Sequence, residues 1–156
     1  MRTKTTDDDA RADIKANGLW GSVFERTFFD VNVFNPLARS CPKTIAESYK
    51  YHEELKKLKY EQQIREVENS TFNPLVFATT GGAGPSATRV MKRLAEKISE
   101  KKKETYMDTI SYIRTRVSFA LLRSSILCLR GCRSLKTANT RTENSISAIL
   151  VEARCE

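Results

Sequence analysis

The residues Thr27 to Phe34, TFFDVNVF, constrain the fold most, because a run of this kind favours only a strand. It is rich in Phe and Val, and Asn35-Pro36 ends it. Side chains two residues apart in a strand lie on the same face of a sheet. Asp30 and Asn32 therefore share one face with two phenylalanines, and the opposite face is apolar. Because an unpaired buried carboxylate is costly, Asp30 needs a cation, a metal ion or hydrogen-bond donors beside it.

A helix is expected next, over residues 44 to 68. Thr44 begins it, and Glu47 stands three residues later, which is the spacing of a capping box. The following residues are mostly Glu, Lys and Leu, which favour helix. Residues 69 to 73 end the helix, and the apolar run PLVFATT at 74 to 80 predicts a buried strand. A strand, a crossover helix and a second strand predict two parallel neighbours in one sheet.

The remaining pattern completes a small α/β fold. A weaker strand at 12 to 19 ends at Asn17-Gly18, close enough to Thr27 for a hairpin. Two more helices are expected at 85 to 103 and 108 to 129. We therefore predict a small mixed β-sheet, made of a β-hairpin, a crossover helix and a third strand, flanked by helices. The domain is predicted to span 11 to 133, with a disordered N-terminus (1 to 10) and a loosely ordered C-terminal tail (134 to 156).

The charge of the chain favours a polyanionic partner. Its 156 residues include 27 Lys or Arg and 19 Asp or Glu, which gives a net charge of +8. Nucleic acid is the first candidate partner and an anionic membrane surface the second. The alternative is that the basic side chains form an ordinary solvated surface.

Cysteine usage and hydropathy indicate an intracellular protein, nuclear or cytoplasmic and not secreted. The four cysteines form no CxxC pair and the chain has one histidine, His52, so a structural zinc site is excluded. No signal peptide is recognisable, and the cysteines are interpreted as reduced thiols. The most apolar window, 117 to 129, is shorter than the ~20 residues of a membrane span and is expected to be a buried core helix.

Asp13 and Asp30 are the candidate metal ligands. Asp13 lies on the weaker strand and could approach Asp30 across the hairpin. Two carboxylates that meet on a strand face make an oxygen-rich site suited to Mg²⁺, which can activate water and neutralise a phosphodiester. The alternative is a structural salt bridge between Asp30 and a lysine of the helix.

The helix supplies that candidate lysine. At helical spacing one stripe of side chains has apolar ends and two polar residues, His52 and Lys56, in its middle. Its members are Ile45, Tyr49, His52, Lys56, Tyr60, Ile64 and Val67. A cation within such a stripe should face an anion, either Asp30 or a bound phosphate. His52 itself is interpreted as a partly buried histidine rather than a metal ligand.

Basic side chains of two helices are the candidate nucleic-acid contacts. They are Lys57, Lys59, Arg89, Lys92, Arg93 and Lys97. Such a surface binds phosphates without reading sequence, and the alternative is again a solvated face. The turn from Gly81 to Pro85 lacks the GxxxxGK[ST] pattern and is not interpreted as a phosphate loop.

Several blocks resemble a known family. ARADIKANGLWG, RTFFDVNVFNP, YKYHEELKKLKYEQQIREVENSTFNPLVFATTGGAGP and RVSFALLRSSILCLRGCRS resemble, in this order, a domain of reverse-transcriptase-associated invertebrate and fish proteins. The similarity covers about residues 7 to 136. Asp30-Val31-Asn32, followed by Lys56 and a strand ending in Gly-Gly, is also similar to the endonuclease-like domain that follows reverse transcriptases in retroelements. That domain has the PD-(D/E)XK pattern, with Asp on one strand and acidic-x-Lys on the next.

The resemblance implies a restriction-endonuclease-like fold and Mg²⁺-dependent hydrolysis of DNA. It makes Asp13 the first metal carboxylate and Asp30 the second. Asn32 stands at the lysine position of the pattern and cannot supply its positive charge, so Lys56 would have to supply that charge from the helix. The first helix of such folds would precede residue 7, which suggests an N-terminal truncation.

Two hypotheses about function follow from the candidate residues and the resemblance. The first is a nucleic-acid-binding domain with Mg²⁺-dependent endonuclease activity, partnered by DNA or RNA and by a reverse transcriptase in cis or in trans. The alternative is a degenerate module that binds DNA, RNA or a protein and cleaves nothing.

Overall fold

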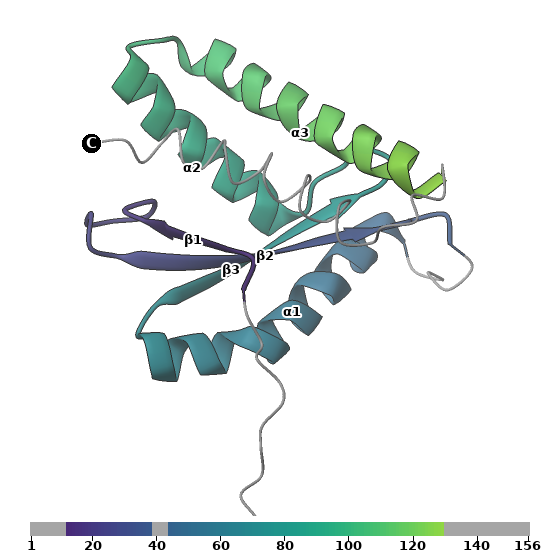
Figure 1. Cartoon of the computed structure of the whole chain (residues 1–156), viewed down its shortest axis with the longest axis horizontal. Coiled ribbons are helices and arrows are strands. Elements are labelled where there is room, and N and C mark those ends of the chain that lie inside the picture. Colours follow the sequence, from purple (N-terminus) through teal and green to yellow (C-terminus); the bar gives the residue numbers. More distant parts are fainter. Residues whose placement is uncertain (1–11, 39–43, 130–156) are drawn as a thin grey trace, which may run out of the picture.

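The computed structural model describes residues 12–38 and 44–129, which form one sheet between two helical layers (Figure 1). Helix α1 covers one face of the sheet, and α2 and α3 lie on the other side. The elements are, in order, β1 (Ile14–Asn17), β2 (Arg26–Phe34), α1 (Ile45–Glu68), β3 (Thr71–Ala78), α2 (Pro85–Lys102) and α3 (Tyr106–Leu129). The predictions of a disordered N-terminus (1 to 10) and a loosely ordered C-terminal tail (134 to 156) fall outside the described residues.

The sheet is mixed, as the sequence predicted. Its strand order is β1-β2-β3, with β1 antiparallel to β2 and β2 parallel to β3. The hairpin register pairs Ile14 with Phe29, and the parallel register pairs Thr27 with Thr71 and Phe34 with Ala78. The α/β prediction of a small mixed sheet flanked by helices is therefore confirmed.

Strand β3 begins three residues earlier than predicted and contains Pro74 in its interior. Its position at the edge of the sheet explains this. The carbonyl of Val76 accepts the Gly84 N–H at 2.8 Å and the Ala78 N–H donates to Gly82 at 2.9 Å, so even-numbered residues of β3 direct their backbone groups away from β2. Pro74 belongs to that set, and its missing N–H removes no bond to β2.

Local signals fix the ends of α1. The Thr44 side chain accepts from the Glu47 N–H, and the Glu47 carboxylate accepts from the Thr44 N–H, so the predicted capping box is present. The helix ends at Asn69, whose φ of 45° is left-handed. Asparagine tolerates this conformation better than most residues do.

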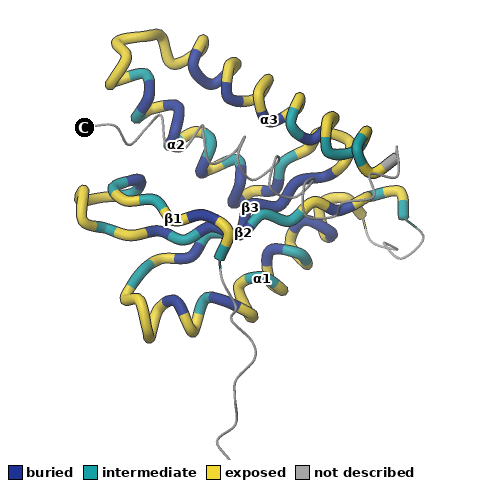
Figure 2. The backbone as a smooth tube through the Cα atoms, in the orientation of Figure 1, coloured by how far each residue is buried: buried dark blue, intermediate teal, exposed yellow. Residues whose placement is uncertain are grey.

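Buried residues occur along the strands and on all three helices (Figure 2), but the two faces of the sheet are packed differently. The face toward α2 and α3 carries one continuous apolar cluster that includes Phe29, Phe77 and Ile113. The face toward α1 carries two small clusters, one around Phe34 and one around Phe72. Burial of apolar side chains between the sheet and helices α2 and α3 therefore contributes most to the stability of the fold.

Two predictions of burial are wrong in part. The ends of the predicted α1 stripe, Ile45 and Val67, are exposed. In the window 117 to 129, Leu121 is buried, but Phe119 and Leu122 are exposed. Helix α3 is an outer helix that packs on α2, so a face of it remains in contact with solvent. None of the helices in the described residues has the length and apolarity that crossing a membrane requires.

Candidate functional site

Asp30 and Lys56 form a partly buried ion pair between β2 and α1. The Lys56 Nζ lies 2.6 Å from Asp30 Oδ2, and the two side chains are 25% and 4% exposed. Oδ2 accepts no hydrogen bond of good geometry within the described residues, so charge attraction dominates this contact. In such a poorly solvated position the attraction is stronger than in water.

The pair lies between the two apolar clusters of the α1 face. One cluster joins Phe34 and Tyr49 of neighbouring elements, and the other joins Tyr60, Ile64 and Phe72. Strand periodicity places Asp30 between Phe28 and Phe34, and helical periodicity places Lys56 between Tyr49 and Tyr60. The same patterns that build the clusters therefore bring the two charges together.

Asp13, the residue immediately before β1, joins this pair. Its Oδ2 accepts the Val31 N–H at 2.7 Å. The hairpin register, continued by one residue beyond the Ile14–Phe29 pair, places Asp13 opposite Asp30. The three side chains that the sequence analysis assigned to one site therefore converge.

The electrostatic surroundings of Asp13 show the same proximity. Partial burial raises the pKa of the Asp13 carboxyl above its ordinary value, and the Asp30 charge raises this pKa further. The Val31 N–H and the Lys56 ammonium oppose this rise in pKa. Asp13 thus interacts with both members of the ion pair.

Asp13 and Asp30 are the two carboxylates at this site. Mg²⁺ is commonly held by one or two carboxylates, with waters and substrate oxygens completing the shell. Asp13 and Asp30 would supply those carboxylates. The described residues contain no group of three or more His, Cys, Asp or Glu side chains placed to hold a metal ion.

Asn32 and His52 are two further polar residues near this site. Asn32 shares the α1 face with Asp30 and is half-buried. The His52 ring stacks on Phe34 with centroids 4.7 Å apart and planes at 30°. His52 is thus partly buried against an aromatic ring.

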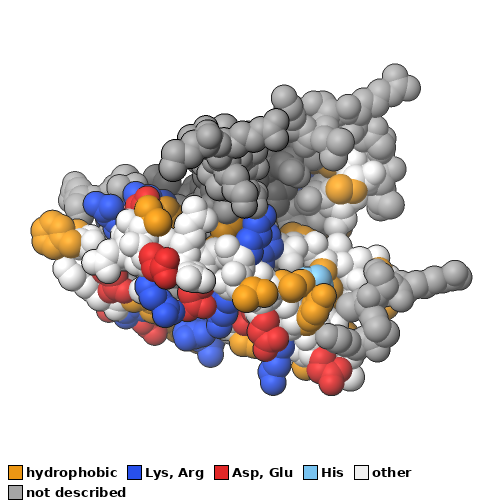
Figure 3. All heavy atoms as spheres, turned by 90° about the horizontal axis from the view of Figure 1, so that it is seen from below, with side chains coloured by type: hydrophobic (Ala, Val, Ile, Leu, Met, Phe, Trp, Pro, Cys, Tyr) orange, Lys and Arg blue, Asp and Glu red, His pale blue; other side chains and the backbone are white. Residues whose placement is uncertain are grey.

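The structure does not gather the predicted nucleic-acid contacts on one surface. Lys57 and Lys59 lie exposed on α1, whereas the other four lie on α2, across the sheet. Arg93 is engaged within the fold, since its Nε donates to the Leu19 carbonyl at 2.9 Å and its guanidinium pairs with Glu96 at 2.8 Å. The view from the α1 side shows basic and acidic side chains interspersed rather than a patch of one sign (Figure 3).

Glu53 is a buried carboxylate that the sequence analysis missed. It is 9% exposed, and its Oε1 accepts the Ser86 N–H at 2.9 Å. Ser86 lies in the first turn of α2, so the carboxylate binds the positive end of that helix. Its spacing of four residues from Tyr49 could have revealed its inward position.

The turn before α2 is shaped to fit this contact. A Cβ at Gly84 would lie 2.7 Å from Glu53 Oε1, and a Cβ at Gly82 would lie 2.3 Å from the Tyr49 hydroxyl. The glycines therefore let the turn approach α1 closely. The Glu53 carboxylate already occupies the first-turn amide that an anion would bind.

No family model, curated protein or solved structure shows significant similarity to this chain.

Proposed function

We propose that this chain is an endonuclease-like nucleic-acid-binding domain of the PD-(D/E)XK type, in which Asp13, Asp30 and Lys56 form a Mg²⁺-dependent site for phosphodiester hydrolysis. The observation that carries the proposal is the 2.6 Å contact between the Lys56 ammonium and the buried Asp30 carboxylate, with Asp13 on the adjoining strand. DNA or RNA would be the substrate, and a reverse transcriptase in cis or in trans a partner, in the nucleus or cytoplasm.

Each residue has a distinct part in this proposal. Bound Mg²⁺ would activate water and neutralise charge on the phosphodiester. Lys56 would contribute the positive charge that Asn32 cannot provide, because its ammonium already lies beside Asp30. Asp13, which lies opposite Asp30, would supply the second carboxylate to the ion.

A plasmid-nicking assay tests the proposal. Full-length protein with Mg²⁺ should convert supercoiled plasmid to open circles, and EDTA should stop the reaction. Asp30→Asn keeps the shape of the side chain and removes its charge, so the rate should fall at least about 100-fold. Glu54→Gln is the matched control, because Glu54 is exposed on α1, the helix that carries Lys56, and its loss of charge should leave the rate unchanged. Equal rates for Asp30→Asn and the native protein would refute the role of Asp30.

A second candidate is a binding module that does not cleave. The specific observation in its favour is that Lys56 already neutralises Asp30, while Asn32 stands at the lysine position of the pattern. This reading predicts salt-dependent binding of DNA or RNA and no nicking with any divalent metal. Mn²⁺ should be tested beside Mg²⁺, since nicking with either ion would contradict it.

A further inference from the structure

A loop between β1 and β2, residues 18–25, holds Trp20 against α2 on the side of the sheet opposite the Asp30 site. Leu19 is 5% exposed and lies in the large core cluster, and its carbonyl accepts the Arg93 Nε at 2.9 Å. The loop closes through the Gly18 N–H, which donates to the Glu25 carbonyl at 2.8 Å. The position of Trp20 is therefore held by hydrogen bonds to the loop backbone and by the burial of its neighbour Leu19 in the core.

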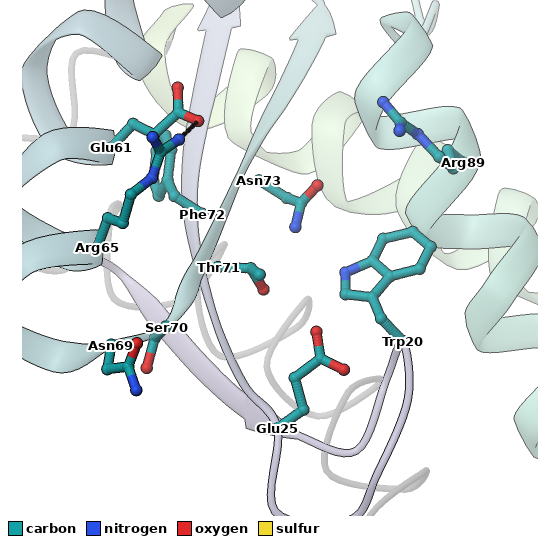
Figure 4. Close-up of a pocket in the computed structure, with 10 residues that line it drawn as sticks. All are labelled: Trp20, Glu25, Glu61, Arg65, Asn69, Ser70, Thr71, Phe72, Asn73 and Arg89. Atoms are coloured by element: carbon teal, nitrogen blue, oxygen red, sulfur yellow. Dashed lines mark hydrogen bonds and ion pairs between the residues drawn. The ribbon is translucent and has the colours of Figure 1, made fainter.

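Trp20 lines two adjoining hollows. The edge hollow, of about 510 Å³, lies beside the first residues of β3 and is lined by Trp20, Asn73 and Arg89 among others (Figure 4). The α2 hollow, of about 410 Å³, is lined by Trp20, Arg89 and Lys92 among others. Trp20 and Arg89 belong to both. Each volume lies in the range of about 300–1,000 Å³ that is typical of ligand sites.

The charge left over is positive in the α2 hollow, whereas in the edge hollow the Glu25 carboxylate balances Arg89. In the edge hollow Arg65 pairs with Glu61 at 2.8 Å, and in the α2 hollow Arg93 pairs with Glu96. Arg89 and Lys92 form no ion pair with any described residue. They are three residues apart on α2 and so project from the same side of the helix.

One buried polar group that lines the edge hollow has no hydrogen-bond partner within the described residues. The Trp20 Nε1 is buried and donates to no acceptor within the described residues. Figure 4 shows this nitrogen and the Asn73 amide facing the same space between β3 and α2. An indole ring beside an amide suits a planar ring with hydrogen-bonding edges, which describes a nucleobase.

We propose that Trp20, Arg89 and Lys92 form a contact site for single-stranded nucleic acid, in which an unpaired base lies against the Trp20 indole and flanking phosphates contact Arg89 and Lys92. Stacking on an aromatic ring beside a cationic groove is how single strands are bound without sequence reading. The choice of nucleic acid as the ligand class rests on the proposed function. The site itself lies on the other face of the sheet from Asp30.

Intrinsic fluorescence tests this directly, because Trp20 is the single tryptophan of the chain. Full-length protein is titrated with short oligothymidylate in EDTA, so that no cleavage can occur. Saturable quenching is expected, and duplex DNA of the same length should quench far less. Equal quenching by duplex, or none by the single strand, would overturn the proposal.

Matched charge variants sharpen the test. Arg89→Gln with Lys92→Gln should flatten the dependence of log affinity on log salt by about 1.4, since each lost phosphate contact to a single strand contributes about 0.7. Arg114→Gln with Arg123→Gln makes the same charge change on exposed positions of α3 outside both hollows. That control should leave the slope unchanged, and an equal effect of both pairs would show only general attraction.

Variants of Trp20 separate stacking from folding. With a labelled oligonucleotide, Trp20→Leu should weaken binding about tenfold, whereas Trp20→Phe should retain most of the affinity. Both must show native-like circular dichroism. Asp30→Asn should bind the oligonucleotide as the native chain does, so loss of nicking without loss of quenching distinguishes the two sites. Quenching without nicking in the native chain would count against the proposed hydrolysis alone, and nicking without quenching against this site alone.

Discussion

The two faces of the sheet differ in both packing and charge. Toward α2 and α3 the face carries one continuous cluster of fourteen buried residues, and toward α1 it carries clusters of four and three with an ion pair between them. Helix α1 has six Glu against five Lys or Arg, whereas α2 has two Glu against six. The basic excess thus lies across the sheet from the Asp30 site.

A small domain can keep a charged pair beside its core when apolar burial elsewhere is large. Burial of apolar surface is the main favourable contribution to folding. The large cluster supplies most of it, so the α1 face can tolerate a carboxylate and an ammonium that contribute little or nothing to net stability. We expect the deletion of a buried apolar side chain to cost more stability on the α2 and α3 side than on the α1 face.

The largest effect should come from the large cluster. Phe29→Ala should lower the free energy of unfolding by about 3–5 kcal/mol, because it removes a fully buried ring from close-packed surroundings. Phe72→Ala makes the same deletion on the α1 face and should cost less, since that cluster is small and can collapse. Urea unfolding of both variants measures the difference. Equal losses would contradict the asymmetry between the faces.

Breaking the ion pair should have the next largest effect. Lys56→Met should cost about 3 kcal/mol, because it leaves the Asp30 carboxylate buried without a cation. Asp30→Asn should cost less, since Lys56 is 25% exposed and can turn its ammonium toward water. Thermal and urea unfolding of the two variants test this order.

The double variant shows whether the pair itself stabilises the fold. Asp30→Leu with Lys56→Met should be close to the native chain in stability, because two apolar side chains replace two desolvated charges. Lys57→Met is the control, since Lys57 is exposed one residue away. If the double variant were as unstable as Lys56→Met, the charges of Asp30 and Lys56 would be required for the stability of the fold.

The contact that joins the two layers should have an intermediate effect. Glu53→Ala should cost about 1–3 kcal/mol, because it leaves the buried Ser86 N–H without an acceptor. Glu53→Gln keeps an acceptor and should cost less. Glu54→Ala, at an exposed neighbouring position, is the control. A loss no greater than that of the control would mean that water replaces the carboxylate.

The smallest effect should come from Asp13. Its pKa is raised in the folded chain, so its ionised form is less favourable there than in the unfolded chain. The resulting penalty is complete above the folded pKa and disappears below the unfolded value of about 3.9. Asp13→Asn should therefore stabilise the fold at neutral pH by about 0.5 kcal/mol or less, given solvent screening of this exposed group.

The pH dependence identifies the cause of that effect. The gain from Asp13→Asn should fall toward zero as the pH is lowered through the folded pKa toward about 3.9. Urea unfolding at a series of pH values measures it. A destabilised variant at neutral pH would show that the bond from the Val31 N–H to the carboxylate outweighs the loss of solvation.

Much of the fold could be predicted because local patterns were strong. The Phe- and Val-rich run gave β2, the Thr44–Glu47 pair gave the start of α1, and the crossover gave the parallel pairing. The start of β3 was placed too late, because proline is excluded from a strand only where its N–H is needed, and sequence does not show which strand is at an edge.

The candidate site was predicted in part, again from local sequence patterns. Periodicity put Asp30 and Lys56 on facing surfaces, and the hairpin brought Asp13 near. It could not show that Glu53 binds the first turn of α2, or that Trp20 and Arg89 line the same hollow. The members of these pairs lie 33 and 69 positions apart in the sequence, and their geometry depends on how α2 packs over the sheet.

By itself the sequence determined which residues share a face of each element, because the backbone repeats of helix and strand are fixed by local sterics. The tertiary structure alone decided which faces meet, which strand forms the edge and which charges remain unpaired. Those outcomes depend on packing between distant segments, where burial and desolvation outweigh any local preference.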